Sequence, residues 1–177
     1  MAQPPNPNSL TRTHKLPGDV VVTIRPIRPE DAAIEKKFVD NLSDSSRYYR
    51  FFYALKEITP SMVDRFTRID PETETALIAV IGHPPGETEI GVARYSTLPE
   101  GETCEFAVVV ADEWQGSGIG TRLMRPLVAD ARARGLSRMD GFVLFENSNM
   151  LKFVKALGFK ITADPGDPAV ARASLKL

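Results

Sequence analysis

The sequence predicts an α+β, or mixed α/β, fold built as one domain of 177 residues. Two observations support this class. Segments in which apolar and polar residues alternate, typical of strands, are interspersed with segments whose apolar residues recur every three or four positions, typical of helices. Some predicted strands follow each other through short turns and others are separated by a helix, so hairpins and crossover connections both occur. Apolar residues form 42% of the chain and charged residues 25%, as expected of a folded globular protein.

The first half of the chain is predicted to contain a tail, a strand, three helices and a hairpin. Residues 1–18 are rich in proline and poor in apolar side chains, so we expect a disordered tail, and we expect the domain to span residues 19–177. The turn-rich residues 82–86 separate two strand-like runs. The predicted elements are a strand at 20–25, helices that begin at Pro29, Ser43 and Thr59, and strands at 75–81 and 89–95.

The second half is predicted to alternate strands with helices. The last helix carries apolar residues at positions 150, 153, 154 and 157, and Gly158 stands where a left-handed cap belongs. The predicted elements are strands at 103–111, 139–145 and 169–177, and helices at 118–134 and 147–157.

Composition argues against several classes of protein. The 22 basic and 23 acidic residues leave a net charge of −1, so we expect neither a general nucleic-acid binder nor a membrane-surface binder. No apolar run approaches the roughly 18 residues of a membrane span, and the amino terminus does not resemble a signal peptide, so we expect a cytoplasmic protein. Cys104 is the only cysteine, and the two histidines lie far apart, so we expect no disulfide and no metal site.

A glycine-rich turn is the segment most informative about function. It follows an apolar strand that ends with Val108, Val109 and Val110, and it opens the longest helix. The first backbone N–H groups of a helix have no partner within the helix, so they can bind phosphate oxygens, and glycines let a phosphate approach closely. The spacing fits neither a Walker A loop nor the GxGxxG turn of dinucleotide-binding proteins. The residues of the turn are Gln115, Gly116, Ser117, Gly118, Ile119, Gly120 and Thr121.

Two motifs resemble those of the GNAT superfamily of N-acetyltransferases. Gln115, Gly118 and Gly120 match the superfamily's pyrophosphate-binding signature, Gln-x-x-Gly-x-Gly. The segment 147–159 is similar to its Asn-x-x-Ala to Leu-Gly-Phe segment. The resemblance covers residues 19–177 and implies the GNAT fold, a central mixed and mostly antiparallel sheet flanked by helices.

The same resemblance implies that acetyl-CoA is the co-substrate and that no metal is required. Backbone groups of Val108–Val110 would pair with the pantetheine as an added strand, and residues 115–121 would hold the pyrophosphate. Asn147 would hydrogen-bond the pantetheine arm, although an asparagine at this position serves equally well as an ordinary helix N-cap.

Further segments resemble the acetyltransferase domain of bacterial Pat-type protein lysine acetyltransferases. These segments are Ile24–Asp31, Ser46–Phe52, Lys56–Glu57 and Cys104–Val110. The resemblance implies transfer of acetyl to a lysine of an acceptor protein such as an acyl-CoA synthetase. Such enzymes commonly carry a fused acyl-CoA-synthetase-like or cyclic-nucleotide-binding domain, for which the 177 residues leave no room. Acetylation of a small-molecule amine and a non-catalytic acyl-CoA sensor are the alternatives.

The reaction needs a group that removes a proton from the acceptor amine. An alkylammonium has a pKa near 10.4, so its deprotonation at pH 7 costs roughly 4.6 kcal/mol, and a carboxylate can accept the proton directly or through a water molecule. The resemblance assigns this role to Glu105, where burial would raise the pKa, and Glu102 is the alternative. The tyrosine that the family often uses as general acid is replaced by Val154.

Two other features admit both a functional and a structural interpretation. The run Arg47–Tyr53 holds five aromatic residues and could stack nucleic-acid bases, but the net charge favours rings packed on the sheet and arginines left in solvent, beside the acceptor cleft. Cys104 could carry an acetyl group, but no histidine is placed to activate it. It shares a strand face with Phe106 and Val108, which favours a buried side chain.

Overall fold

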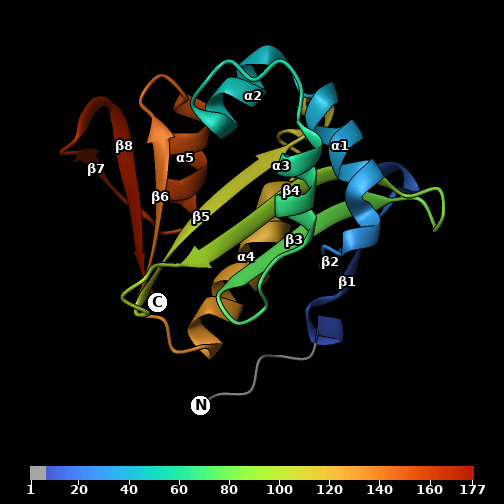
Figure 1. The fold of residues 1–177 in the computed structure, drawn as a ribbon, viewed down its shortest axis with the longest axis horizontal. Coiled ribbons are helices and arrows are strands. Elements are labelled where there is room, and N and C mark those ends of the chain that lie inside the picture. The colour runs from blue at the N-terminus through green and yellow to red at the C-terminus, as the bar shows by residue number, and fades with distance from the viewer. Residues whose placement is uncertain (1–6) are drawn as a thin grey trace.

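A computed structural model describes residues 7–177 and shows one sheet with helices on both faces (Figure 1). The strands are β1 (Arg12–Lys15), β2 (Val21–Pro26), β3 (Glu74–Ile81), β4 (Thr88–Thr97), β5 (Thr103–Val110), β6 (Arg138–Leu144), β7 (Lys160–Asp164) and β8 (Asp167–Lys176). The α-helices are α1 (Ala32–Asn41), α2 (Asp44–Phe51), α3 (Pro60–Thr67), α4 (Ile119–Ala133) and α5 (Ser148–Ala156).

The eight strands lie in the order β1-β2-β3-β4-β5-β6-β8-β7. Within residues 7–177, β5 and β6 form the one parallel pair, and the other neighbours are antiparallel. A parallel pair needs a crossover connection, and α4 provides it. The structure thus confirms the predicted α+β class and its mixed, mostly antiparallel sheet.

Apolar side chains on the two faces of the sheet form two separate cores. Successive strand residues point to opposite faces, so Leu77 packs with Leu127 of α4, while the neighbouring Ile78 packs with Phe38 of α1 and Val63 of α3. Helices α4 and α5 therefore cover one face, and α1 and α3 cover the other, with α2 above the β5–β6 end (Figure 1). No helix within residues 7–177 combines the length and the apolar character that crossing a membrane requires.

Local signals at the helix ends explain where the predicted helices begin and end. The side chains of Ser43 and Thr59 each accept a hydrogen bond from the backbone N–H three residues later, as N-caps do. Gly158 has a φ of 95°, the left-handed conformation predicted for the residue after α5. The starts predicted for α2 and α3 and the cap predicted after α5 are thereby confirmed.

The start of the chain corrects one prediction. Residues 1–6 lie outside the described residues, but β1 pairs antiparallel with β2 from Arg12 opposite Ile24 to Lys15 opposite Val21. The side chains of β1 are mostly exposed, so backbone hydrogen bonds to β2, rather than apolar burial, hold this edge strand. The prediction of a disordered tail is therefore wrong for these residues.

Strands β5 and β6 lie side by side only where they begin (Figure 1). The last of three paired positions joins Glu105 to Asp140, whereas β5 remains paired with β4 as far as Val110. The ring of Phe106 on β5 packs directly against Gly141 on β6 at the point of divergence. It fills the space that a side chain at position 141 would need, since a Cβ built there would lie 2.3 Å from the ring. Beyond this point, the edge of β5 that faces β6 has no strand partner within residues 7–177.

Candidate active site

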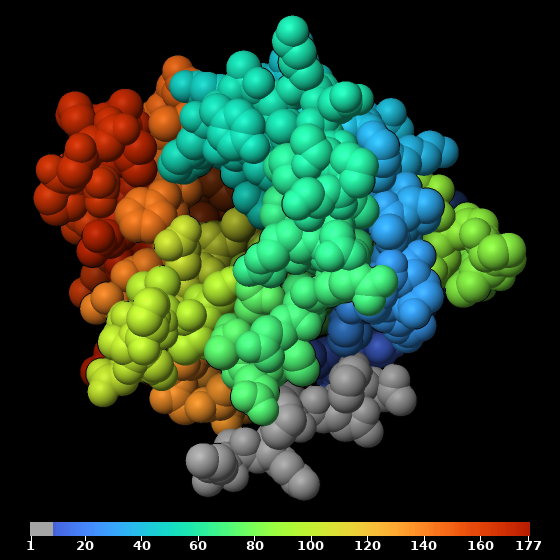
Figure 2. Space-filling model, in the orientation of Figure 1, coloured from blue at the N-terminus to red at the C-terminus, as the bar shows by residue number. Residues whose placement is uncertain are grey.

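A cleft of about 1290 Å³ opens where β5 and β6 diverge. Its floor is β5 from Glu105 to Val110, and its walls are α2, the glycine-rich turn before α4, and β6 with the start of α5. Figure 2 shows the mouth as a hollow bordered by α2. Of the predicted site residues, all except Ser117 and Ile119 line this cleft.

The glycine-rich turn presents a set of free backbone donors. The N–H groups of Gly116, Gly118, Ile119, Gly120 and Thr121 donate to no backbone acceptor within residues 7–177. Gly116 and Gly118 have φ values of 77° and 85°, which side chains other than glycine rarely adopt. Unpaired donors at the start of a fifteen-residue helix suit an anionic ligand, and a diphosphate fits this arrangement.

Three other side chains of the turn, those of Gln115, Ser117 and Ile119, make contacts that hold its shape, and of these only Gln115 also lines the cleft. The side chain of Gln115 donates to the carbonyl of Val110, at 3.1 Å, and to the hydroxyl of Ser46, at 3.3 Å. Ile119 is fully buried in the core, and the hydroxyl of Ser117 donates to a backbone carbonyl within the turn. The geometry therefore does not favour direct contact between a ligand and the side chains of Ser117 and Ile119.

The backbone of β5 alternates between its two neighbours. The N–H of Ala111 donates to the carbonyl of Ile90 on the β4 side, and the carbonyl of Val110 accepts from Gln115 on the opposite side. Because successive strand residues direct their polar groups to opposite sides, Val108 and Val110 face the free edge and Val109 faces β4. The first two can pair with an extended ligand, and Val109 contributes to the floor of the cleft.

Glu105 lies at the point where the free edge of β5 begins, on the face that α2 covers. Its side chain is exposed in the cleft, and its register partner across the sheet is the buried Asp140, which Arg138 binds at 3.0 Å. Partial burial and the negative charge of Asp140 raise the pKa of Glu105, and the positive charge of Arg50 opposes that rise. The site therefore holds a carboxylate whose affinity for a proton is enhanced.

Two other candidates from the sequence, Glu102 and Cys104, lie outside the cleft, as does Val154 at the position of the family's tyrosine. Glu102 precedes β5, is exposed and does not line the cleft. Its backbone carbonyl accepts hydrogen bonds from the N–H and the hydroxyl of Ser137. Cys104 is fully buried, and burial together with Asp140 raises the pKa of its thiol to about 12, so it carries no thiolate near neutral pH. Val154 is a fully buried core residue.

Asn147 serves as the N-cap of α5. Its side-chain oxygen accepts a hydrogen bond from the N–H of Met150 at 3.2 Å, and its side chain also lines the cleft. The structure therefore shows the capping interaction that the sequence allows. The contact with pantetheine stays a prediction.

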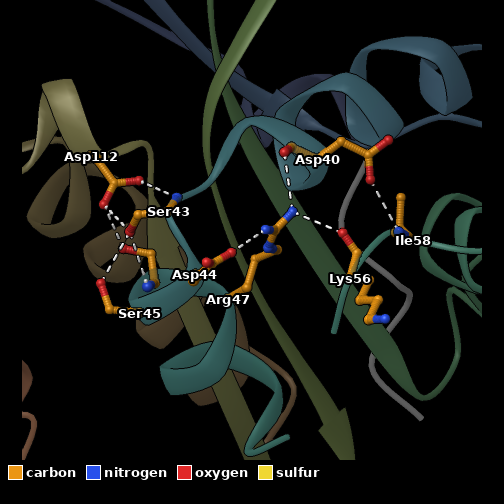
Figure 3. Close-up of polar contacts among 9 residues, drawn as sticks. Asp40, Ser43, Asp44, Ser45, Arg47, Lys56, Ile58 and Asp112 are labelled. Atoms are coloured by element: carbon orange, nitrogen blue, oxygen red, sulfur yellow. Dashed lines mark hydrogen bonds and ion pairs between the residues drawn. The ribbon is translucent and has the colours of Figure 1, made fainter. Parts of the chain in front are cut away.

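A cluster of hydrogen bonds fastens the start of α2 to the β5–α4 turn (Figure 3). Asp112 accepts three of them: from the N–H of Ser43 at 2.9 Å, from the Ser43 hydroxyl at 2.6 Å and from the Ser46 hydroxyl at 2.7 Å. Nothing in the sequence singles out Asp112, because its partners lie 66 and 69 residues away in the chain. This clamp fixes one wall of the cleft.

The arginines of α2 are not left in solvent, which corrects another prediction. Arg47 donates to the carboxylate of Asp44 at 2.5 Å and to the carbonyls of Asp40 and Lys56 (Figure 3). These bonds tie α2 to the end of α1 and to the segment after α2. Since both terminal nitrogens of Arg47 are bonded within the protein, the run does not present them to a nucleic-acid backbone.

Sequence comparison identifies the family. The chain matches the acetyltransferase (GNAT) family over residues 39–159. It is 38% identical over 147 residues to an acetyltransferase of Pseudomonas aeruginosa, a match that covers 82% of this chain and 78% of that protein. It is 30% identical over 144 residues to Acetyltransferase Pat of Mycolicibacterium smegmatis, covering 76% of this chain but 40% of that longer protein.

Structural comparison agrees. The GNAT domain of S. lividans PAT superposes with a TM-score of 0.87 at 28% identity, over 97% of this chain and 99% of that domain. The motifs in the sequence, the split between β5 and β6 and these similarities all agree. The chain belongs to the GNAT family of acetyltransferases, enzymes that take the acetyl group from acetyl-CoA.

Proposed function

We propose that this acetyltransferase modifies a lysine side chain of a protein and that Glu105 accepts the proton of the attacking amine. The position of Glu105 carries the proposal: the carboxylate is exposed in the cleft where the free edge of β5 begins. Acetyl-CoA supplies the acetyl group as a thioester whose thiol is a good leaving group. This last property makes a general acid at position 154 dispensable.

The free backbone donors of the cleft are the groups that would hold acetyl-CoA. The unpaired N–H groups between Gly116 and Thr121 suit its diphosphate, and the edge of Val108 and Val110 suits the amides of its pantetheine arm. The two sets follow one another along the cleft, from the turn after Val110 back along β5 toward Glu105. A thioester held along this edge would meet an amine that enters beside Glu105.

The role of Glu105 follows from the proton balance of the amine. A lysine side chain is protonated at neutral pH, and freeing its lone pair costs roughly 4.6 kcal/mol. A carboxylate whose pKa is raised takes up that proton more readily than an ordinary one, and both burial and Asp140 act in this direction on Glu105. Deprotonation and attack can thus occur in one site.

A protein acceptor is supported by the rim of the cleft. Phe52, directly after α2, lines the cleft and remains exposed, and three further large side chains near these elements are also exposed: Tyr48 in α2, Tyr53 after it and Phe145 after β6. Exposed aromatic residues at and near a cleft offer contact area to a polypeptide rather than to a small amine. The similarity to the Pat proteins of two other bacteria supports the same acceptor class.

The experiment compares Glu105→Gln with the matched control Glu102→Gln. An acyl-CoA synthetase and lysine-containing peptides serve as acceptors, and acetylation is followed by mass spectrometry. We expect the first variant to lose about 10²–10⁴-fold in kcat with its affinity for CoA unchanged by calorimetry, and the control to keep wild-type activity. Equal activity of the two variants would refute the role of Glu105, and turnover confined to small amines would refute the protein acceptor.

A further inference from the structure

Arg50 is a cationic residue of the cleft that the reaction described above does not use. It lies in the last turn of α2, and its side chain lines the cleft together with Glu105. The guanidinium lies over the ring of Phe51, 4.9 Å from its centroid, and 6.0 Å from the centroid of Phe66. Stacking on two rings of a packed cluster fixes the position of this charge.

The guanidinium of Arg50 has no hydrogen-bonding acceptor among residues 7–177. The other partly buried arginines of this half of the molecule are paired: Arg25 donates to Asp31 and Glu87, and Arg47 to three acceptors. Burial and the nearby charge of Arg94 lower the pKa of Arg50 to about 10, which leaves it charged at neutral pH. A half-buried cation whose donors have no acceptor within the described residues is stabilised when an anion binds it.

Arg50 and Glu105 form a matched pair of opposite charges on the cleft. Each influences the pKa of the other, but no direct ion pair joins them. The space beside them can therefore take a ligand that carries an ammonium next to an anionic group, with the ammonium at Glu105 and the anion at Arg50. Such a ligand satisfies both charges at once.

The diphosphate of acetyl-CoA is not the anion that this geometry suits. Its donors lie at the other end of α2, where Ser46 contacts Gln115. Eight helical residues span about 12 Å, and Arg50 stands one turn beyond Ser46 on the side of Glu105. The anion at Arg50 must then belong to the acceptor.

We propose that Arg50 recognises a carboxylate beside the acceptor amine, so that the preferred acceptor is a lysine flanked by an acidic residue. This inference rests on the proposed function and names the sequence context of the lysine. A planar guanidinium can bind a carboxylate through two parallel hydrogen bonds, which a neutral amide cannot reproduce.

The test uses a pair of peptides that contain one lysine and differ only in glutamate or glutamine next to it. We expect wild-type kcat/KM to favour the glutamate peptide by about tenfold or more, because a charge-assisted bidentate bond is lost with glutamine. Arg50→Gln abolishes the preference, and Arg50→Lys retains part of it. The control Arg132→Gln, at an exposed position of α4, keeps the full preference. The preference is the ratio of kcat/KM for the two peptides, measured with one preparation of enzyme. Partial misfolding of a variant lowers both values equally, so it does not change the ratio.

The outcomes separate this inference from the proposed function. Equal kcat/KM for the two peptides, or an unchanged preference in Arg50→Gln, overturns the role of Arg50 while protein acetylation stands. If neither peptide is acetylated, the protein acceptor is refuted, and a pair of small amines with and without a carboxylate then tests Arg50 in the same way. No discrimination in that pair, or no turnover of either amine, overturns the inference as well.

Discussion

The substitution Gly141→Ala tests the explanation given for the divergence of β5 and β6. A Cβ at this position would lie 2.3, 2.6 and 2.8 Å from three atoms of the Phe106 ring. Carbon atoms in ordinary contact are about 3.5–4.0 Å apart. The ring cannot simply move away, because it packs on Phe159 with the centroids 4.9 Å apart. Overpacking of this kind costs about 1–3 kcal/mol, and a loss of about 2 kcal/mol lowers the Tm of a domain of this size by about 4–8 °C.

The assay is urea unfolding followed by circular dichroism, with Gly141→Ala, Phe106→Leu and the double variant forming a cycle. Because leucine is smaller than the ring, we expect the double variant to be more stable than the sum of the single effects predicts, by about 1 kcal/mol. Gly86→Ala is the control, since its nearest neighbour would be 3.4 Å away and its φ is ordinary. A wild-type unfolding midpoint for Gly141→Ala would refute the claim that Phe106 fills the split.

Two further predictions concern carboxylates near the cleft. Asp140→Asn removes the negative charge opposite Glu105, so the pKa of Glu105 falls. The acid limb of the pH profile of kcat/KM should therefore move to lower pH, and a limb at the wild-type position would contradict this. Burial alone would raise the pKa of Asp112, but hydrogen bonds from Ser43 and Ser46 outweigh it and hold that pKa below its ordinary value. Its contribution to stability is therefore complete above the ordinary value of about 3.9 and is lost as the pH falls through the lower, folded-state pKa. Asp112→Asn should reduce hydrogen-exchange protection of α2 by about tenfold at pH 7, and equal protection would show that the clamp does not stabilise the helix.

Elements with a buried apolar pattern could be predicted from the sequence, and the two edge strands could not. Strand β7 carries mostly exposed or half-buried side chains, and β1 likewise, so neither shows the alternation that marks a strand with one buried face. Both are held by backbone pairing with the adjacent strand, β8 for β7 and β2 for β1. Almost every residue carries the same backbone donor and acceptor, so pairing through the backbone alone produces no recognisable pattern of apolar and polar residues in the sequence.

The candidate site likewise has a part that the sequence predicts and a part that it does not. The glycine-rich turn is local, because a strand, its glycines and the following helix lie in one short segment, and the sequence alone predicts it. Asp140 and Arg50 stand 35 and 55 residues from Glu105, and they reach it only through the parallel register of β5 with β6 and the packing of α2 over β5. Register depends on the whole sheet, so a single sequence does not reveal these neighbours.

Helix α2 contacts the turn through Ser46 and, one helical turn later, carries Arg50 on the acceptor side. In the proposed arrangement, the two substrates therefore share one wall of the cleft. If binding of a diphosphate at the turn shifts this wall, thermodynamic linkage requires binding of the acceptor to affect the turn by an equal free energy. Any coupling between the affinities for the two proposed substrates would then pass through these eight residues of α2.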